Sequence, residues 1–111
     1  DALRRRCLYH WIDYPEPQRA AAIVRRSVPG ATAALIEHAT QFVGRARELD
    51  LDKPPGMAET IDWVAALVML GVGDLVDPAA VAGLSALGKT PDDSTALDEA
   101  LTDYRAQLAT G

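Results

Sequence analysis

The stretch that decides the fold reads MAETIDWVAALVMLG and spans residues 57–71. Apolar side chains take most positions of this run, so on a helix they would cover most of its circumference rather than a single stripe. A helix of this kind has to be covered by neighbours on several sides. We therefore expect residues 57–71 to form the central helix of a bundle, ended by Gly71-Val72-Gly73.

Apolar residues also recur at three- and four-residue steps on both sides of the central run, which is the helical period. Ala, Leu and Val dominate the apolar residues and aromatics make up only 5% of the chain, a bias that favours packed helices over sheet. Pro-rich starts, Gly-rich ends and short connections predict a compact antiparallel bundle of about five helices. The four helices expected besides the central one cover residues 16–27, 31–49, 78–87 and 94–109, the last capped by Asp93 or Ser94.

Residues 7–14 differ from the rest, because they are rich in aromatic and β-branched types. They predict one short strand that ends at Pro15. A lone strand leaves its backbone groups without partners, so it has to join a body outside this chain. The fold class is therefore an all-α bundle preceded by one short N-terminal strand, and a chain that opens on Asp1 without a methionine is expected to be a fragment or a processed product.

The net charge is −5, and it is unevenly distributed: +3 over residues 1–30 and −8 over residues 31–111. An acidic chain is a poor nonspecific partner for nucleic acid. No apolar run approaches the ~20 residues needed to span a bilayer. Cys7 is the single cysteine, so no internal disulfide forms and the cytoplasm is the expected location. His10 and His38 are isolated, and no metal site is expected.

Residues 83–90 match the phosphate-loop pattern G-x-x-x-x-G-K-[ST] in full. That pattern needs a buried strand before it and a helix starting at its Lys-Thr pair. An Ala-rich helix start precedes it here, and Asp92 and Asp93 follow, where they would repel phosphates. We expect a helix that ends at Gly88 and then a turn, with a small nucleotide-binding enzyme using Lys89 as the rival interpretation.

Two further sets of charged residues each allow two interpretations. Glu59 and Asp62 lie at i, i+3 on the central helix, either as a solvated face or as a carboxylate pair for acid–base chemistry. The run of arginines at 4–6 is either exposed or supplies a guanidinium to a phosphate, for which its planar fork is suited.

Two stretches resemble a known family. Residues 3–15, followed by Arg19 and Ala22-Ile23-Val24, look like the junction of core and lid in MoxR-like AAA+ ATPases. Residues 53–63 resemble the start of the lid helix in the subgroup associated with carbon monoxide dehydrogenase maturation. The two motifs are about 38 residues apart, and with the helices between them the resemblance covers nearly the whole chain.

The resemblance implies two parts: residues 1–14 as the last strand of the AAA+ core, with the arginine-finger region, and residues 15–111 as the helical lid. Arg6, and after it Arg5, would be the catalytic finger presented to the neighbouring subunit. The family places a sensor arginine at the start of the third lid helix. This chain has Met57-Ala58-Glu59 there, with Lys53 nearby, so Lys53, Ala58 and Glu59 are the expected nucleotide-facing positions.

The same resemblance implies the cofactors and partners. ATP and Mg²⁺ would be bound by the full-length protein and not by this fragment alone. The partners would be the core domain of the same chain, neighbouring subunits of a homo-oligomeric ring, and a von Willebrand factor A-domain protein. The ATPase would couple hydrolysis to chaperone-like maturation of a client.

An alternative from a different class stays open. The chain would be a free-standing helical interaction module without nucleotide binding, docking partners through the apolar third helix and through Tyr9, Trp11 and Tyr14.

Overall fold

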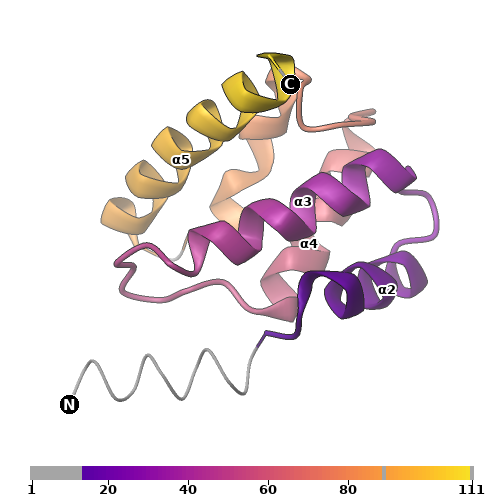
Figure 1. Cartoon of the computed structure of the whole chain (residues 1–111), viewed down its shortest axis with the longest axis horizontal. Helices are drawn as coiled ribbons and strands as arrows, with labels where there is room; N and C mark the ends of the chain where they lie inside the picture. The colour runs from indigo at the N-terminus through magenta and orange to yellow at the C-terminus, as the bar shows by residue number, and fades with distance from the viewer. Residues whose placement is uncertain (1–13, 89, 111) are drawn as a thin grey trace.

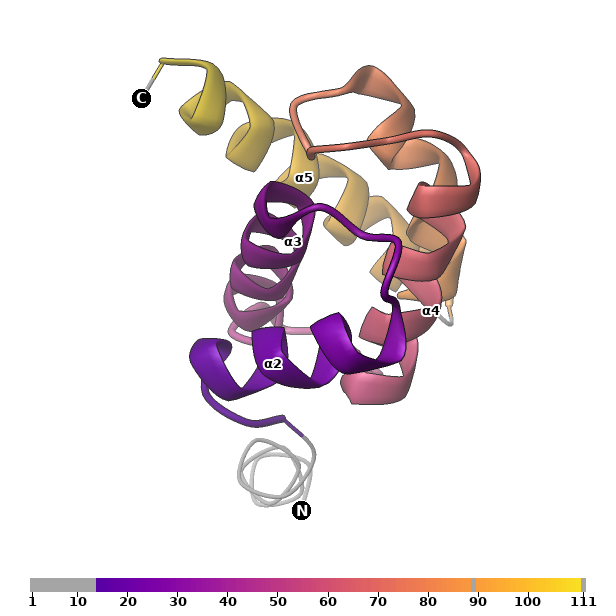
Figure 2. The same cartoon turned by 90° about the vertical axis from the view of Figure 1, so that its right-hand side faces the viewer.

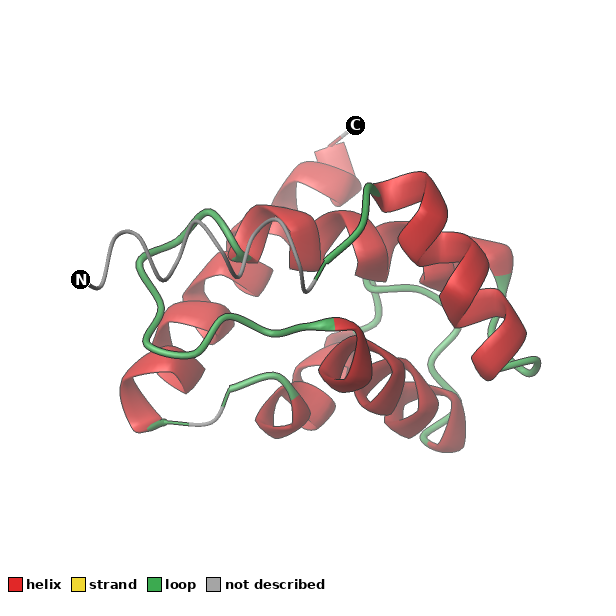
Figure 3. Ribbon diagram, turned by 90° about the horizontal axis from the view of Figure 1, so that it is seen from below, coloured by secondary structure: helices red, strands yellow, loops and turns green. Residues whose placement is uncertain are grey.

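The computed structural model describes residues 14–88 and 90–110, with Ala82 described by its backbone alone. Within these residues the chain forms helices and loops and no strand (Figure 3). The expected all-helical bundle of about five helices is confirmed, whereas the strand expected at 7–14 falls on residues 7–13 outside the described part and on Tyr14, which lies in a loop. The elements are α2 (Pro17–Ser27), α3 (Ala33–Ala46), α4 (Met57–Met69), the 3₁₀ helix η1 (Pro78–Ala86) and α5 (Pro91–Thr110).

Helix α4 takes the central place that its composition predicts. It packs against α2, α3 and η1. Trp63, Val64 and Leu67 of α4 are fully buried, and the Trp63 ring lies 5.7 Å from the ring of Phe42 on α3. The C-terminal end of the helix reaches solvent, where Met69 is 88% exposed.

Helix α3 separates α2 from α5, as two perpendicular views show (Figure 1, Figure 2). Thr32 caps α3, because its hydroxyl accepts a hydrogen bond from the Leu35 amide at 3.0 Å. The same hydroxyl donates to the carbonyl of Gly73 at 2.6 Å, which ties the start of α3 to the loop after α4. On the opposite face of the bundle core, Tyr104 of α5 packs its ring 5.7 Å from that of Phe42.

The fourth helix is of the 3₁₀ type over its whole length. Asp77 caps it, as expected, by accepting from the Ala79 amide at 2.9 Å. Its buried positions fall at i, i+3, i+4 and i+7, the spacing of a helix with one face against the core. They are Ala80, Gly83 and Leu84 within η1 and Leu87 directly after it.

Helix α5 begins three residues earlier than expected, and the expected cap is wrong. Thr90 is the capping residue: its hydroxyl accepts from the Asp93 amide at 3.1 Å, and Pro91 takes the first helical position. Asp93 therefore lies inside the first turn, and its carboxylate is free to reach outside the helix. The ends of α3 and α4 lie two to three residues before the expected ones, at Ala46 and Met69.

Candidate functional site

The stretch that matches the phosphate-loop pattern is built differently from a phosphate loop. The residues before it form the 3₁₀ helix η1 and not a strand. Gly83 lies in that helix against the indole of Trp63, where a Cβ atom would come within 3.0 Å of Cδ1. Gly88 lies against Ser94, whose Oγ would be 2.7 Å from such a Cβ. A side chain at either position would therefore crowd its neighbours, which gives both glycines a packing role, and Lys89 lies outside the described residues.

Replacing Gly83 by alanine tests this interpretation. The added methyl meets a buried indole that is wedged against Phe42, so we expect the free energy of unfolding to fall by about 1–2 kcal/mol. The matched control is Gly44→Ala on α3, where no heavy atom lies within 4 Å of the new Cβ. That control should be neutral or more stable by about 0.5–1 kcal/mol. Urea denaturation followed by circular dichroism measures both, and equal effects at the two glycines would refute the packing role.

The start of α4 holds the three nucleotide-facing positions expected from the resemblance. Glu59 uses its carboxylate locally, because Oε1 accepts from the Gly56 amide at 2.9 Å and so satisfies a free donor at the helix start. Ala58 is exposed, and so is the side chain of Lys53. Asp62 is exposed one turn after Glu59, and no hydrogen bond or ion pair among the described residues joins it to Glu59. The structure thus gives Glu59 a capping role rather than a place in a carboxylate pair.

The connector before α4 is held by a buried carboxylate. Asp93 is 3% exposed, and its two oxygens accept from the amides of Asp52 and Lys53, each at 2.9 Å. This carboxylate fixes the backbone of the Lys53 position on the N-terminal turn of α5. The sequence pattern predicts only a capping role for Asp93.

Replacing Asp93 by alanine should remove both hydrogen bonds and leave two amide donors without their acceptor. We expect a loss of about 2–3 kcal/mol in the free energy of unfolding, the range for hydrogen bonds to a charged group. Asp92→Ala, at the exposed neighbouring position in the same first turn, is the control and should cost less than about 1 kcal/mol. Chemical denaturation compares the two, and a loss no larger for Asp93 than for Asp92 would contradict the anchoring role.

Tyr14, where the chain enters the bundle, is held by Thr40 and Arg47. Its hydroxyl donates to the carbonyl of Thr40 on α3 at 3.3 Å. The guanidinium of Arg47 lies 5.3 Å from the centre of its ring, in a cation–π arrangement. Nη1 of Arg47 also donates to the carbonyl of Pro55 at 2.6 Å, one residue before the cap of α4. The entry point at Tyr14 and the start of α4 are therefore joined through one buried arginine.

Burial raises the pKa of Tyr14 from 10.0 to about 12, while a hydrogen bond with the Thr60 side chain and the charge of Arg47 act in the opposite direction. The unfolded chain releases this proton near pH 10, before the folded chain does. The protonated hydroxyl thus stabilises the folded chain by about 2–3 kcal/mol, and this stabilisation is complete below pH 10. It is lost as the pH rises through about 12.

Tyr14→Phe keeps the ring and removes the titrating hydroxyl. We expect its free energy of unfolding to fall less steeply with pH between about 10 and 12 than that of the wild type. Denaturation curves at successive pH values measure this slope, and identical slopes would mean that Tyr14 is not the titrating group.

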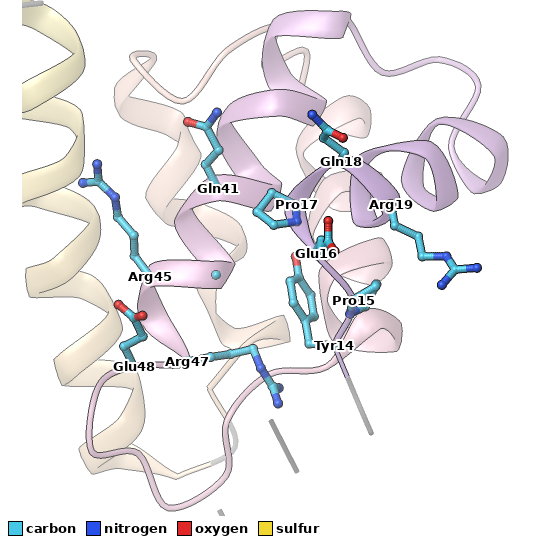
Figure 4. A pocket seen from close by; sticks show the side chains of 11 residues that line it. Tyr14, Pro15, Glu16, Pro17, Gln18, Arg19, Gln41, Arg45, Arg47 and Glu48 are labelled. Carbon is cyan, nitrogen blue, oxygen red and sulfur yellow. The ribbon is translucent and has the colours of Figure 1, made fainter. Parts of the chain in front are cut away.

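An open hollow of about 1250 Å³ lies beside this junction, between the start of α2 and the C-terminal half of α3 (Figure 4). Arg45 is already engaged: it stacks over Tyr104 at 4.9 Å and donates to Gln107 at 2.7 Å. Figure 4 shows Arg19 pointing away from Tyr14, so the cations of this hollow do not converge on one point. A wide hollow without converging groups suits contact with another protein surface better than an enclosed small ligand. Its lining comprises residues 14–19 together with Gln41, Gly44, Arg45, Arg47 and Glu48.

Arg5 and Arg6 lie outside the described part of the chain, as does His10. His38 is partly exposed, as expected, and Nδ1 lies 2.5 Å from Oδ1 of Asp74. Across residues 14–88 and 90–110 no group of three or more His, Cys, Asp or Glu side chains is arranged to hold a metal ion.

No helix in the described part is both long and apolar enough to cross a bilayer. Comparison with known protein families, with curated proteins and with solved structures finds no match to this chain. The class defined by the fold and the site is an all-helical bundle with an open hollow where the chain enters it.

Proposed function

We propose that this chain is the helical lid of a MoxR-like AAA+ ATPase, which closes over ATP and couples hydrolysis to chaperone-like maturation or remodelling of a client protein. The observation that carries the proposal is the meeting of the two stretches that resemble the family. The first ends at Tyr14 and Pro15, the second includes Pro55 and Thr60, and Arg47 contacts both Tyr14 and Pro55. Sequence motifs about 38 residues apart thus lie at one corner of the bundle.

The contact between these two stretches suits a lid that moves relative to its core. In the proposal, residues 1–14 belong to the core, so the chain would cross from core to lid at Tyr14. Because Tyr14 is held by Thr40 and Arg47, movement of the bundle would be passed to the core through a fixed point rather than a loose tether. The open hollow beside Tyr14 offers a surface on which the core would rest.

The nucleotide site would then lie largely in the core, with ATP and Mg²⁺ bound there. Lys53 is the described cation nearest in sequence to the start of α4, and its backbone is anchored by Asp93 while its side chain is exposed. In the proposal this exposed ammonium faces the nucleotide in place of a sensor arginine. The partners would be the core of the same chain, the neighbouring subunits of a ring and a von Willebrand factor A-domain protein.

The experiment compares the 111-residue chain with the longer protein that carries the core. We expect no ATP turnover by the 111 residues alone, turnover by the longer protein, and loss of turnover when residues 15–111 are deleted from it. Lys89→Ala should change nothing in nucleotide binding, because the phosphate-loop match would play no part. Appreciable turnover by the 111 residues alone would refute the proposal.

The second candidate function is a helical interaction module that does not bind nucleotide. It is favoured by the exposure of Met69 (88%) and Leu70 (55%) at the end of the apolar third helix. Tyr14 does not contribute to such a surface, because its ring is covered by Arg47 and its hydroxyl is bonded to Thr40. ATP turnover by the longer protein would distinguish the two functions, because an interaction module would need neither a core domain nor ATP.

A further inference from the structure

Two faces of the bundle carry opposite charge. Helix α2 has three arginines and no acidic residue, and all three arginines are exposed. Helix α5 has five carboxylates and one arginine, and four of the carboxylates are exposed. None of these seven exposed side chains has a hydrogen-bond or ion-pair partner among the residues that the structure describes. They are Arg19, Arg25 and Arg26 on α2, and Asp92, Asp98, Glu99 and Asp103 on α5.

Helix dipoles stabilise only some of these charged side chains. Arg25 and Arg26 stand at the C-terminus of α2 and Asp92 at the N-terminus of α5, where each is stabilised by its own helix. Arg19 stands in the first turn of α2, where the dipole repels a cation. Glu99 and Asp103 lie beyond the first turn of α5 and form a like-charged i, i+4 pair, which destabilises an isolated helix. Arg19 and the pair Glu99 and Asp103 therefore lower the stability of an isolated molecule.

The two faces also match in spacing and in position. Arg19 and Arg26 are seven residues apart on α2, as are Asp92 and Glu99 on α5, and seven residues rise about 10.5 Å along a helix. The stripe Arg19–Arg26 on α2 and the stripe Asp92–Glu99 on α5 thus have the same spacing of charges. Helices α2 and α5 lie on opposite sides of α3 (Figure 1, Figure 2), so one molecule cannot pair the two stripes itself.

We propose that α2 of one molecule binds α5 of a second copy of this chain, head to tail, by pairing these stripes. Each copy then offers α2 to one neighbour and α5 to the other, which produces a ring if the rotation closes and a filament if it does not. A contact between two helices buries less than the ~1,200 Å² of a stable complex, so the association is weak and depends on salt. It requires no nucleotide, and its failure would leave the proposed function untouched.

The test is sedimentation of the 111-residue chain over a range of concentrations up to about 0.5 mM, at about 20 mM and about 300 mM salt. The expected result is an average mass that rises with concentration at low salt, with an association constant at least about tenfold smaller at high salt. Two variants reverse one stripe each: Arg19→Glu with Arg26→Glu, and Asp92→Lys with Glu99→Lys. Each should be monomeric alone, and an equimolar mixture of the two should associate again, because the reversed stripes complement one another.

The matched control is Glu48→Lys with Asp62→Lys, which changes the net charge as much as the α5 variant but at exposed positions on other elements. It should associate like the wild type. Far-ultraviolet circular dichroism checks that every variant keeps its helices. A wild type that is monomeric at low salt throughout, association that survives either reversal, or a mixture that fails to associate would each overturn the proposal.

Discussion

If the chain is the proposed lid, replacing Arg6 by alanine in the longer protein is expected to lower ATP turnover about 10³-fold while ATP binding is retained. The reason is electrostatic, because the proposed finger would supply a guanidinium to the neighbouring subunit's nucleotide and stabilise the charge that develops on the γ-phosphoryl group in the transition state. Arg6 is the best match to the arginine-finger position in the resemblance, and Arg5 the second. Steady-state ATP turnover and equilibrium nucleotide binding, measured on the same preparation, separate the chemical step from binding.

Arg25→Ala is the control for this measurement, because Arg25 is exposed at the end of α2 and outside the resembling motif. Its turnover should stay within about twofold of the wild type, since it is not expected to reach the transferred phosphoryl group. Arg5→Ala should have a smaller effect than Arg6→Ala. Unchanged turnover in both Arg5→Ala and Arg6→Ala would remove the arginine finger from this part of the chain.

Replacing Trp63 by alanine is expected to reduce the free energy of unfolding by about 3–5 kcal/mol. Trp63 is fully buried in the central helix, with its ring against Phe42 and its edge against Gly83. Its removal leaves a cavity between Phe42 of α3 and Gly83 of η1. A domain of this size has a total stability of about 5–15 kcal/mol, so the variant should be partly unfolded well below the wild-type midpoint.

Met69→Ala is the matched control, because Met69 lies on the same helix and is 88% exposed. It should change stability by no more than about 0.5 kcal/mol. Thermal and urea unfolding of both variants, followed by circular dichroism, give the comparison. A Trp63 variant as stable as the Met69 variant would mean that α4 is not the centre of the core.

The parts of the fold that the sequence predicts are those fixed by local periodicity. The nearly continuous apolar surface of residues 57–71 predicts a central helix, and Trp63, Val64 and Leu67 are indeed fully buried. Pro and Gly positions place most helix ends within a few residues. These signals come from the chain's own neighbouring positions, which is why they can be read without a structure.

The features that were missed depend on partners far along the chain. Asp93 resembles a helix cap in the sequence, but its carboxylate oxygens accept hydrogen bonds from the amides of residues 52 and 53. Gly83 of η1 packs against Trp63, twenty residues earlier. Neither contact leaves a local pattern.

Arg47 is the exception, because a local signal was present. Arg45 and Arg47 are two residues apart on a helix, so their side chains point to nearly opposite sides. One of them therefore has to face the bundle. The structure shows Arg47 buried against Tyr14 and Pro55, whereas Arg45 lies at the surface over Tyr104.

The proposal that these helices form the lid of an AAA+ ATPase makes a sharp prediction for the reading frame upstream of Asp1. Sequencing that frame should reveal a strand, a glycine-rich phosphate loop with its lysine, and a helix, followed by a second strand that ends in acidic residues. An upstream frame that lacks both the phosphate loop and the acidic strand would refute the proposed lid.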